Sequence, residues 1–292
     1  MAKKDLKNRK TIPIKLNGKA CPYLLNQVEK RLKKDKKTII FTPNPEFVVL
    51  AKKDRSFRRI LDKADISLAD GSYLFWANYI QHKREKRSNY YQKHFLERFL
   101  LSLTWGFGGG FRLHCGNLAE KRISGTDFIL DLLGLAQKHD WPVFFLGAAP
   151  GVAHRAAEKL RVKFPKLKVA GCFAGNGSPE GDKETGRAIK RASLSLKKGK
   201  ISMLFVAYGM GKQEQWIIRN LPNIPVNMAM GVGGAFDYHS ELVPRAPVWL
   251  RKRSGEWIYR LVRQPWRLKR QLALWKFLWL VLTEQVFLNF EN

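Results

Sequence analysis

Short runs of apolar and β-branched residues alternate along the chain with stretches in which apolar positions recur every three or four residues. The short runs are typical of buried strands, and the wider spacing is typical of helices that bury one face. The pattern predicts strands at residues 38–41, 66–69, 143–147, 168–172, 201–209 and 226–234. It predicts helices after the first strand to about residue 63 and at residues 126–139, 151–164, 183–196 and 212–220.

This alternation predicts an α/β fold with a Rossmann-like parallel sheet as its core. In such a sheet the loops that bind ligands follow the carboxyl ends of the strands. We expect the catalytic core to occupy residues 38–244, after a basic N-terminal segment at 1–37. Residues 81–118 are interpreted as an atypical basic and aromatic insertion, and residues 245–292 as a basic, tryptophan-rich, helical appendage that contacts a membrane.

Polar residues follow the first two predicted strands. Thr42 and Asn44 stand in a loop fixed by two prolines, and Asp70 directly precedes a glycine. The ends of parallel strands meet at one edge of a sheet, so these residues would place a carboxylate at its mouth. The alternative is that Asn44 and Asp70 only form turns and cap helices, as such residues often do.

Glycine-rich loops follow the later strands: GAAPG (147–151), YGMGKQEQW (208–216) and GVGGAFD (231–237). Glycines let a backbone approach a ligand closely, a helix start offers N–H groups to an anion, and a lysine and an aspartate add polar contacts. The loops predict a nucleotide or nucleotide-sugar cleft, with tight packing of sheet against helix as the alternative. The candidate binding residues are Gly147, Gly209, Lys212, Gln213, Glu214, Gly231, Gly233, Gly234 and Asp237.

Net charge narrows the choice of partner. The 292 residues include 54 Lys and Arg against 24 Asp and Glu, a formal net charge of +30, which indicates a nucleic acid, an anionic lipid or a phosphorylated ligand as partner. No RRM, KH or zinc-finger signature is present, and non-specific nucleic-acid binding is kept only as an alternative. The three cysteines lie far apart without a CxxC pair, so the sequence predicts neither a metal site nor a disulfide framework.

Five blocks of the sequence, in order along the chain, resemble one known family. They are TPNPEFVVLAKKDRSFRRILDKADISLADG (42–71), RISGTDF (122–128), VFFLGAAPGVAHRAAEKL (143–160), GMGKQEQWI (209–217) and the stretch from GVGGAFD to RQPWRL (231–268). Together they resemble the WecG/TagA/CpsF family of bacterial glycosyltransferases over about residues 38–270, apart from 81–118. The chain departs from the family pattern at Gly211, where a proline usually precedes Lys-Gln-Glu.

The resemblance implies transfer of N-acetylmannosamine, or a related sugar, from a UDP donor to a polyprenyl-diphosphate-linked saccharide, in teichoic acid, enterobacterial common antigen or capsule synthesis. It implies inversion at the sugar, with no covalent intermediate, cofactor or obligatory metal. Asp70 would be the general base, with Thr42 and Asn44 in the same pocket, and the KQE and GVGG blocks would line the donor cleft. A fold of this family that has lost activity and scaffolds a membrane complex is a further alternative, and the three pocket residues together argue against it.

The C-terminal segment combines cations with tryptophans. Residues 245–276 contain ten Lys or Arg and a single acid, Glu256, with tryptophans at positions 249, 257, 266 and 275. Such a helix fits the plane of an anionic bilayer, where each cation is worth about 1 kcal/mol. The apolar run at 272–282 is shorter than the roughly 20 residues that span a bilayer. The alternative is a helical cap that packs its tryptophans on the core.

These features predict a cytoplasmic protein that is peripheral on the inner face of the cell membrane and has no specific nucleic acid as partner. Formation of a homo-oligomer stays open. The resemblance places arginines of the appendage over the donor phosphates, and Arg260, Arg263 and Arg267 recur every three or four residues, as one helix face requires. We also expect the core to fold without the residues after Pro244.

Overall fold

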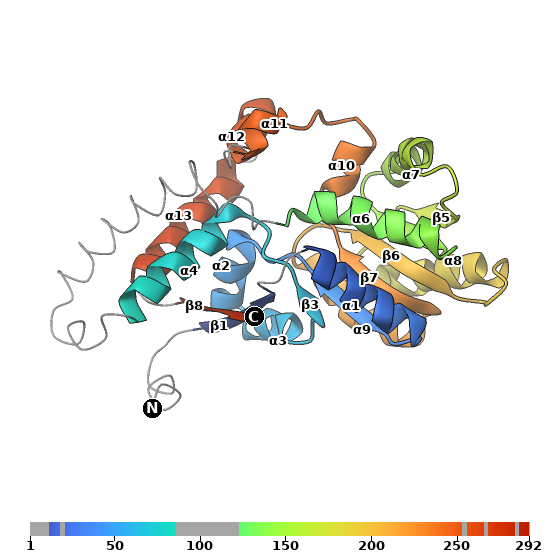
Figure 1. Cartoon of the computed structure of the whole chain (residues 1–292), viewed down its shortest axis with the longest axis horizontal. Helices are drawn as coiled ribbons and strands as arrows, with labels where there is room; N and C mark the ends of the chain where they lie inside the picture. The colour runs from blue at the N-terminus through green and yellow to red at the C-terminus, as the bar shows by residue number, and fades with distance from the viewer. Residues whose placement is uncertain are drawn as a thin grey trace.

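A sheet of six parallel strands forms the centre of the computed structural model, which describes residues 12–17, 21–85, 123–252, 256–265, 268–283 and 286–291 (Figure 1). From one edge to the other, its strands are β3 (Ile66–Ser67), β2 (Thr38–Phe41), β7 (Val226–Gly231), β6 (Ile201–Ala207), β4 (Val143–Gly147) and β5 (Val169–Phe173). Every neighbouring pair runs parallel. The α/β fold with a parallel sheet, predicted from the alternating pattern, is confirmed.

The central strands are apolar on both faces because helices cover both. β4 and β7 are buried along their whole length. The residues of β4 alternate between two apolar clusters, with Phe144 and Leu146 in one and Val143 and Phe145 in the other. Strands covered on both sides have continuous apolar runs in their sequence. Full burial of one such side chain is worth about 1.5–3 kcal/mol, so these strands make a large contribution to stability.

Helices cover the two faces of the sheet (Figure 1). The first cluster lies under α2 (Pro45–Lys53), α3 (Arg55–Leu61), α8 (Asp182–Leu194) and α9 (Lys212–Asn220). The second lies under α1 (Cys21–Lys33), α6 (Gly125–Lys138), α7 (Val152–Lys163) and α10 (Ala235–His239). The remaining elements of this part are α4 (Ser72–Glu85), η2 (Pro179–Gly181) and η3 (Leu221–Asn223).

Three strands end earlier than the sequence predicted. β3, β6 and β7 end at Ser67, Ala207 and Gly231, whereas the predictions extended to residues 69, 209 and 234. In the latter two cases the chain turns away at glycines with positive φ, Gly209 at 83° and Gly233 at 53°. The additional residues therefore belong to the loops at the strand ends.

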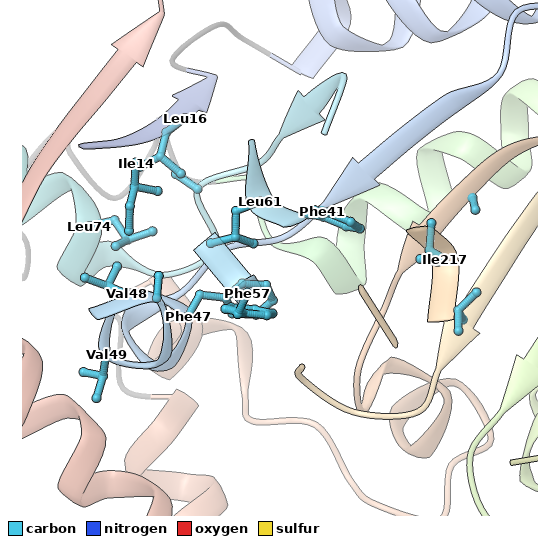
Figure 2. Packing of buried hydrophobic residues seen from close by; sticks show 14 of the residues in the cluster. Ile14, Leu16, Phe41, Phe47, Val48, Val49, Phe57, Leu61, Leu74 and Ile217 are labelled. Carbon is cyan, nitrogen blue, oxygen red and sulfur yellow. The ribbon is translucent and has the colours of Figure 1, made fainter. Parts of the chain in front are cut away.

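Segments from the two ends of the chain meet in a second sheet, where β1 (Ile12–Asn17) pairs in parallel with β8 (Val286–Glu291). Asn17 joins this pair to the main sheet, because its side-chain oxygen accepts a hydrogen bond from the backbone N–H of Ser67 at 2.6 Å. Figure 2 shows Ile14 of β1 in one apolar cluster with Leu74 of α4 and Val48 of α2. The pattern of apolar residues predicted neither of these two strands.

The C-terminal segment forms α11 (Val248–Lys252), α12 (Glu256–Arg263) and α13 (Leu268–Leu282) before it reaches β8. α13 packs against α2, and its residues Phe277, Leu280 and Val281 are buried in the first apolar cluster. The structure therefore argues against the expectation that the core folds without the residues after Pro244. This segment covers α2 and supplies the partner strand of β1.

The tryptophans of this segment whose side chains are described do not pack on the core. Trp249, Trp275 and Trp279 are 61%, 69% and 57% exposed. The segment does cover the core, but not through these tryptophans, as the helical-cap alternative supposed. Among the residues that the structure describes, every helix is too short or too polar to cross a bilayer. Residues 86–118 of the predicted insertion, and the side chains of Trp257 and Trp266, lie outside the description.

Candidate active site

The candidate residues gather at the carboxyl ends of the strands of the main sheet, which is the edge meant from here on. β3, β2, β7, β6 and β4 are successive neighbours and run in the same direction, so the loops that follow them open at the same edge. In that order, the loops carry Asp70, then Thr42 and Asn44, then residues 231–234, 209–214 and Gly147. α/β proteins bind their ligands outside the carboxyl ends of such strands.

Thr42 and Asp70 face a common point beside the first residue of α6. Thr42 is buried, and its hydroxyl donates to the carbonyl oxygen of Gly231 at 3.3 Å, which joins the ends of β2 and β7. A Cβ atom added to Gly125 would lie 3.0 Å from Thr42 Cγ2 and 3.6 Å from Asp70 Oδ2. Asp70 is only partly buried, and its backbone N–H donates to the carbonyl oxygen of Pro43 at 2.8 Å. The fold therefore brings the candidate base and the candidate threonine together.

Asn44 caps the helix that begins beside this pair. Its side-chain oxygen accepts hydrogen bonds from the backbone N–H groups of Glu46 at 2.9 Å and Phe47 at 3.3 Å, at the start of α2. A cap of this kind is typically worth about 1 kcal/mol. The geometry thus matches the alternative interpretation of Asn44, and only its amide N–H groups are left to face a substrate.

Gln213 and Glu214 connect the two glycine-rich loops through buried hydrogen bonds. Both side chains are buried. One oxygen of Glu214 accepts from the backbone N–H of Gly211 at 2.6 Å, and the other accepts from the Gln213 side-chain amide at 2.6 Å. The Gln213 oxygen in turn accepts from the backbone N–H of Gly233 at 2.9 Å. These two residues therefore hold the loop after β6 to the loop after β7.

Gly231 leaves room for this network. A Cβ atom added there would lie 2.8 Å from Gln213 Nε2 and 2.9 Å from Glu214 Oε1, closer than real Cβ contacts. Burial raises the pKa of Glu214 to about 7, although the hydrogen bonds from Gln213 and Gly211 act in the opposite direction. A side chain at position 231 would displace two buried polar groups that satisfy each other.

The other candidate glycines separate into two kinds. Gly209 and Gly233 have positive φ, and an added Cβ would meet nothing within 4 Å, so open space adjoins their backbone. Gly147 also has positive φ, but an added Cβ would lie 2.8 Å from the carbonyl carbon of Ala207. The close approach of β4 to β6 explains Gly147, as the packing alternative supposed, whereas Gly209 and Gly233 border space that a ligand can fill.

Three further candidates lie at the starts of the helices that follow these loops. Lys212 is the first residue of α9 and is exposed, so its ammonium group is available to an anion at this edge. Gly234 directly precedes α10, and Asp237 lies in the first turn of that helix, partly buried. Both helices thus begin at the edge that carries Asp70.

The arginines of the C-terminal segment are described only in part. Arg263, the last residue of α12, is exposed, and its guanidinium carbon lies 5.5 Å from the centre of the Tyr259 ring. The side chains of Arg260 and Arg267 lie outside the described part of the chain. Their placement over donor phosphates stays a prediction.

An ion-paired cluster that the sequence analysis missed lies at the start of α6. The guanidinium of Arg245 donates to both carboxylate oxygens of Asp127, at 2.5 and 2.9 Å, and to Glu256 at 3.4 Å. His239 Nε2 lies 3.2 Å from the carbonyl oxygen of Thr126, and burial lowers the pKa of His239 to about 4. The sequence did carry a signal, since Asp127 lies in the RISGTDF block and Glu256 is the single acid among the cations of residues 245–276.

Taken together, the edge offers a carboxylate beside a threonine and two glycine turns bordered by open space. A carboxylate placed in this way can take a proton from a hydroxyl group, and glycine turns admit a phosphate-bearing ligand to the backbone. Within the described ranges, no three His, Cys, Asp or Glu side chains gather as a metal ion would require.

Comparison with known proteins gives one consistent family. The model of the glycosyl transferase WecG/TagA/CpsF family matches residues 10–103 and 106–290. An N-acetylglucosaminyldiphosphoundecaprenol N-acetyl-β-D-mannosaminyltransferase of Bacillus subtilis strain 168 is 29% identical over 247 residues, which cover 85% of this chain and 80% of the relative. A protein of the same name from Bacillus spizizenii strain W23 is 27% identical over 254 residues, which cover 87% of this chain and 82% of the relative.

Proposed function

Because the chain belongs to the WecG/TagA/CpsF family of glycosyl transferases, we propose that it transfers N-acetylmannosamine from a UDP donor to an N-acetylglucosaminyl diphosphate carried on a polyprenol. The names of the two Bacillus relatives support this choice of sugar and acceptor. The observation that carries the proposal is the position of Asp70, beside Thr42 and at the same edge as the two glycine-rich loops.

Asp70 acts as the general base in this proposal. An acceptor hydroxyl attacks the anomeric carbon of the donor sugar, its proton passes to the Asp70 carboxylate, and the bond from that carbon to UDP breaks. Attack from the face opposite the leaving group inverts the anomeric configuration. A sugar hydroxyl is a poor nucleophile, and a positioned base typically contributes about 10²–10⁴-fold to the rate.

The donor is assigned to the loops after β6 and β7. The open space beside Gly209 and Gly233 accepts the nucleotide sugar, and the buried Gln213–Glu214 network keeps the two loops in register. The exposed Lys212 offsets the charge that develops on the leaving diphosphate, which is the kind of electrostatic stabilisation that transferases require. Asp237, on the helix after the second loop, is assigned to the base or sugar of the nucleotide.

The acceptor arrives from a membrane surface. α13 exposes Trp275 and Trp279, and Lys276 between them is exposed as well. Tryptophans with nearby cations fit the interface of an anionic bilayer, which supports a peripheral position at the inner face of the cell membrane. A polyprenyl-linked acceptor is held in the same bilayer.

Purified protein incubated with a panel of UDP-sugars and a short-chain polyprenyl-diphosphate N-acetylglucosamine tests the function. Mass spectrometry of the lipid product should show addition of one N-acetylhexosamine, with UDP-N-acetylmannosamine preferred. Absence of transfer from every donor, together with salt-dependent binding of oligonucleotides, would favour the nucleic-acid alternative instead.

A further inference from the structure

Three consecutive residues at the start of α6 contact three different parts of the molecule. Gly125 faces the candidate base and threonine, as described above. The carbonyl oxygen of Thr126 accepts from the ring N–H of His239 in α10, the helix after the second glycine-rich loop. The carboxylate of Asp127 binds Arg245, which belongs to the segment that leads to α11 and α12. The first turn of α6 therefore lies beside the candidate base and bonds to the helix on the donor side and to the C-terminal segment.

Arg245 is well placed to fix the C-terminal segment to this turn. Its side chain is only 19% exposed, and that of its second partner Glu256 is 15% exposed. The two bonds to Asp127 are bidentate, a geometry that the planar guanidinium favours and that a lysine ammonium does not reproduce. Because Glu256 is the first residue of α12, one guanidinium spans from α6 to α12.

The chain around Arg245 restricts its own movement. Pro244 and Pro247 fix φ on either side, and Ala246 between them is buried. The carbonyl oxygen of Ala246 also accepts a hydrogen bond from Arg251 Nε at 3.0 Å. Figure 1 shows α11 and α12 side by side at the top of the view, at the end of the connection that follows α10. The bridge thus joins two elements through a stiff connection.

We propose that Arg245 is a positioning residue of the transfer reaction, which holds α12 in place against the turn of α6 that faces Asp70. This inference rests on the proposed function and on the prediction that Arg260 and Arg263 of α12 lie over the donor phosphates. Loss of the bridge leaves Asp70 and the glycine-rich loops in place but lets α12 shift relative to them. A displacement of about 1 Å in reacting groups is enough to lower a rate by about 10²-fold.

The matched control is Arg31, which makes a similar bridge at the opposite edge of the sheet. Its guanidinium donates to Asp65 at 2.5 Å and to the Thr38 hydroxyl at 3.0 Å. Thr38 begins β2 and Asp65 directly precedes β3, so this bridge lies at the amino ends of the strands, away from the candidate site. Arg31→Ala removes a partly buried ion pair without touching the catalytic edge.

Hydrogen–deuterium exchange of the full-length protein without ligands tests the bridge directly. Arg245→Ala should speed exchange both in the first turns of α6 and in α12, Arg245→Lys should do so to a smaller extent, and Arg31→Ala should change neither segment. Exchange in α12 of Arg245→Ala that equals wild type would overturn the proposal, whatever the protein catalyses.

Turnover with the short-chain acceptor tests the consequence. Arg245→Ala should lower kcat at least about tenfold. The kcat of Arg31→Ala should stay within about twofold of wild type, even if the two variants lose the same amount in melting temperature. Asp127→Ala combined with Arg245→Ala should be no slower than Arg245→Ala alone, because the two residues act as one unit. A kcat of Arg245→Ala within twofold of wild type refutes the positioning role. If the wild-type protein shows no transfer activity, the proposed function is refuted, and the exchange experiment alone then decides whether Arg245 holds α12.

Discussion

Gly231→Ala is the sharpest test of the network under the candidate donor cleft. The added methyl group would lie 2.8 Å from Gln213 Nε2 and 2.9 Å from Glu214 Oε1. Both side chains are buried and bonded to each other and to the backbones of Gly211 and Gly233, so neither can move without losing a hydrogen bond. The substitution therefore acts on the network, not on the backbone of Gly231, whose φ is not positive.

The magnitude follows from two contributions. Overpacking of a well-packed interior costs about 1–3 kcal/mol. Displacement of Gln213 forfeits at least one neutral hydrogen bond, about 0.5–1.5 kcal/mol, and weakens one to the buried Glu214. We expect Gly231→Ala to lower the free energy of unfolding by about 2–4 kcal/mol, measured by urea denaturation. UDP affinity, measured by calorimetry, should fall at least about tenfold because the two loops lose their register.

Gly209→Ala is the control for the stability effect of this change. An added Cβ there meets nothing within 4 Å, although the positive φ of 83° makes the position costly for alanine by about 1–2 kcal/mol. This variant should lose stability without disturbing Gln213 and Glu214. A Gly231→Ala protein that is as stable as wild type and binds UDP with unchanged affinity would show that the loops do not depend on the network.

Three further predictions test the base, the buried acid and the C-terminal segment. Asp70→Asn removes the base at constant size, so transfer should fall at least about 10²-fold while UDP affinity stays close to wild type, and an unimpaired rate would eliminate Asp70 as the base. Burial raises the pKa of Glu214 from 4.5 to about 7, so the folded state holds its proton over that range and stability falls by about 3 kcal/mol as pH rises through it. The free energy of unfolding of wild type relative to Glu214→Gln should therefore decrease from pH 5 to pH 8, and an equal difference at both pH values would contradict this. Truncation after Pro244 exposes the surface that Phe277, Leu280 and Val281 cover, at about 1.5–3 kcal/mol for each, so it should abolish cooperative melting followed by circular dichroism.

The sequence predicted the central sheet well because its strands are buried on both faces. The run VFFLG at residues 143–147 contains no polar residue, and the stretches before and after it have the spacing of apolar residues that is typical of helices. The grouping of Thr42 and Asp70 was equally accessible, since residues after parallel strands must lie at one edge. Both inferences depend on local pattern and on one rule of topology.

Some of the remaining features depend on contacts between residues that are distant in the sequence, which local pattern does not encode. β1 and β8 are separated by almost the whole chain, and they pair with each other in a separate two-stranded sheet. Gln213 and Glu214 use their buried side chains to bond the backbones of Gly211 and Gly233, a contact that their residue types did not indicate, and substrate contact by them stays a prediction. Asn44 caps a helix, an alternative that composition alone could not decide.

The two-sided character of α13 relates the membrane to the candidate site. One side, with Phe277 and Leu280, is buried against α2, and the other exposes Trp275 and Trp279. Exposed tryptophans on such a helix fit the interface of a bilayer, which supports the proposed contact with a membrane. α2 is nine residues long, about 14 Å, and it begins directly after Asn44, at the edge that carries the base. On the proposed function, a bilayer that receives these tryptophans therefore lies close enough for the saccharide of a polyprenyl-linked acceptor to reach Asp70 while its lipid chain stays in the membrane.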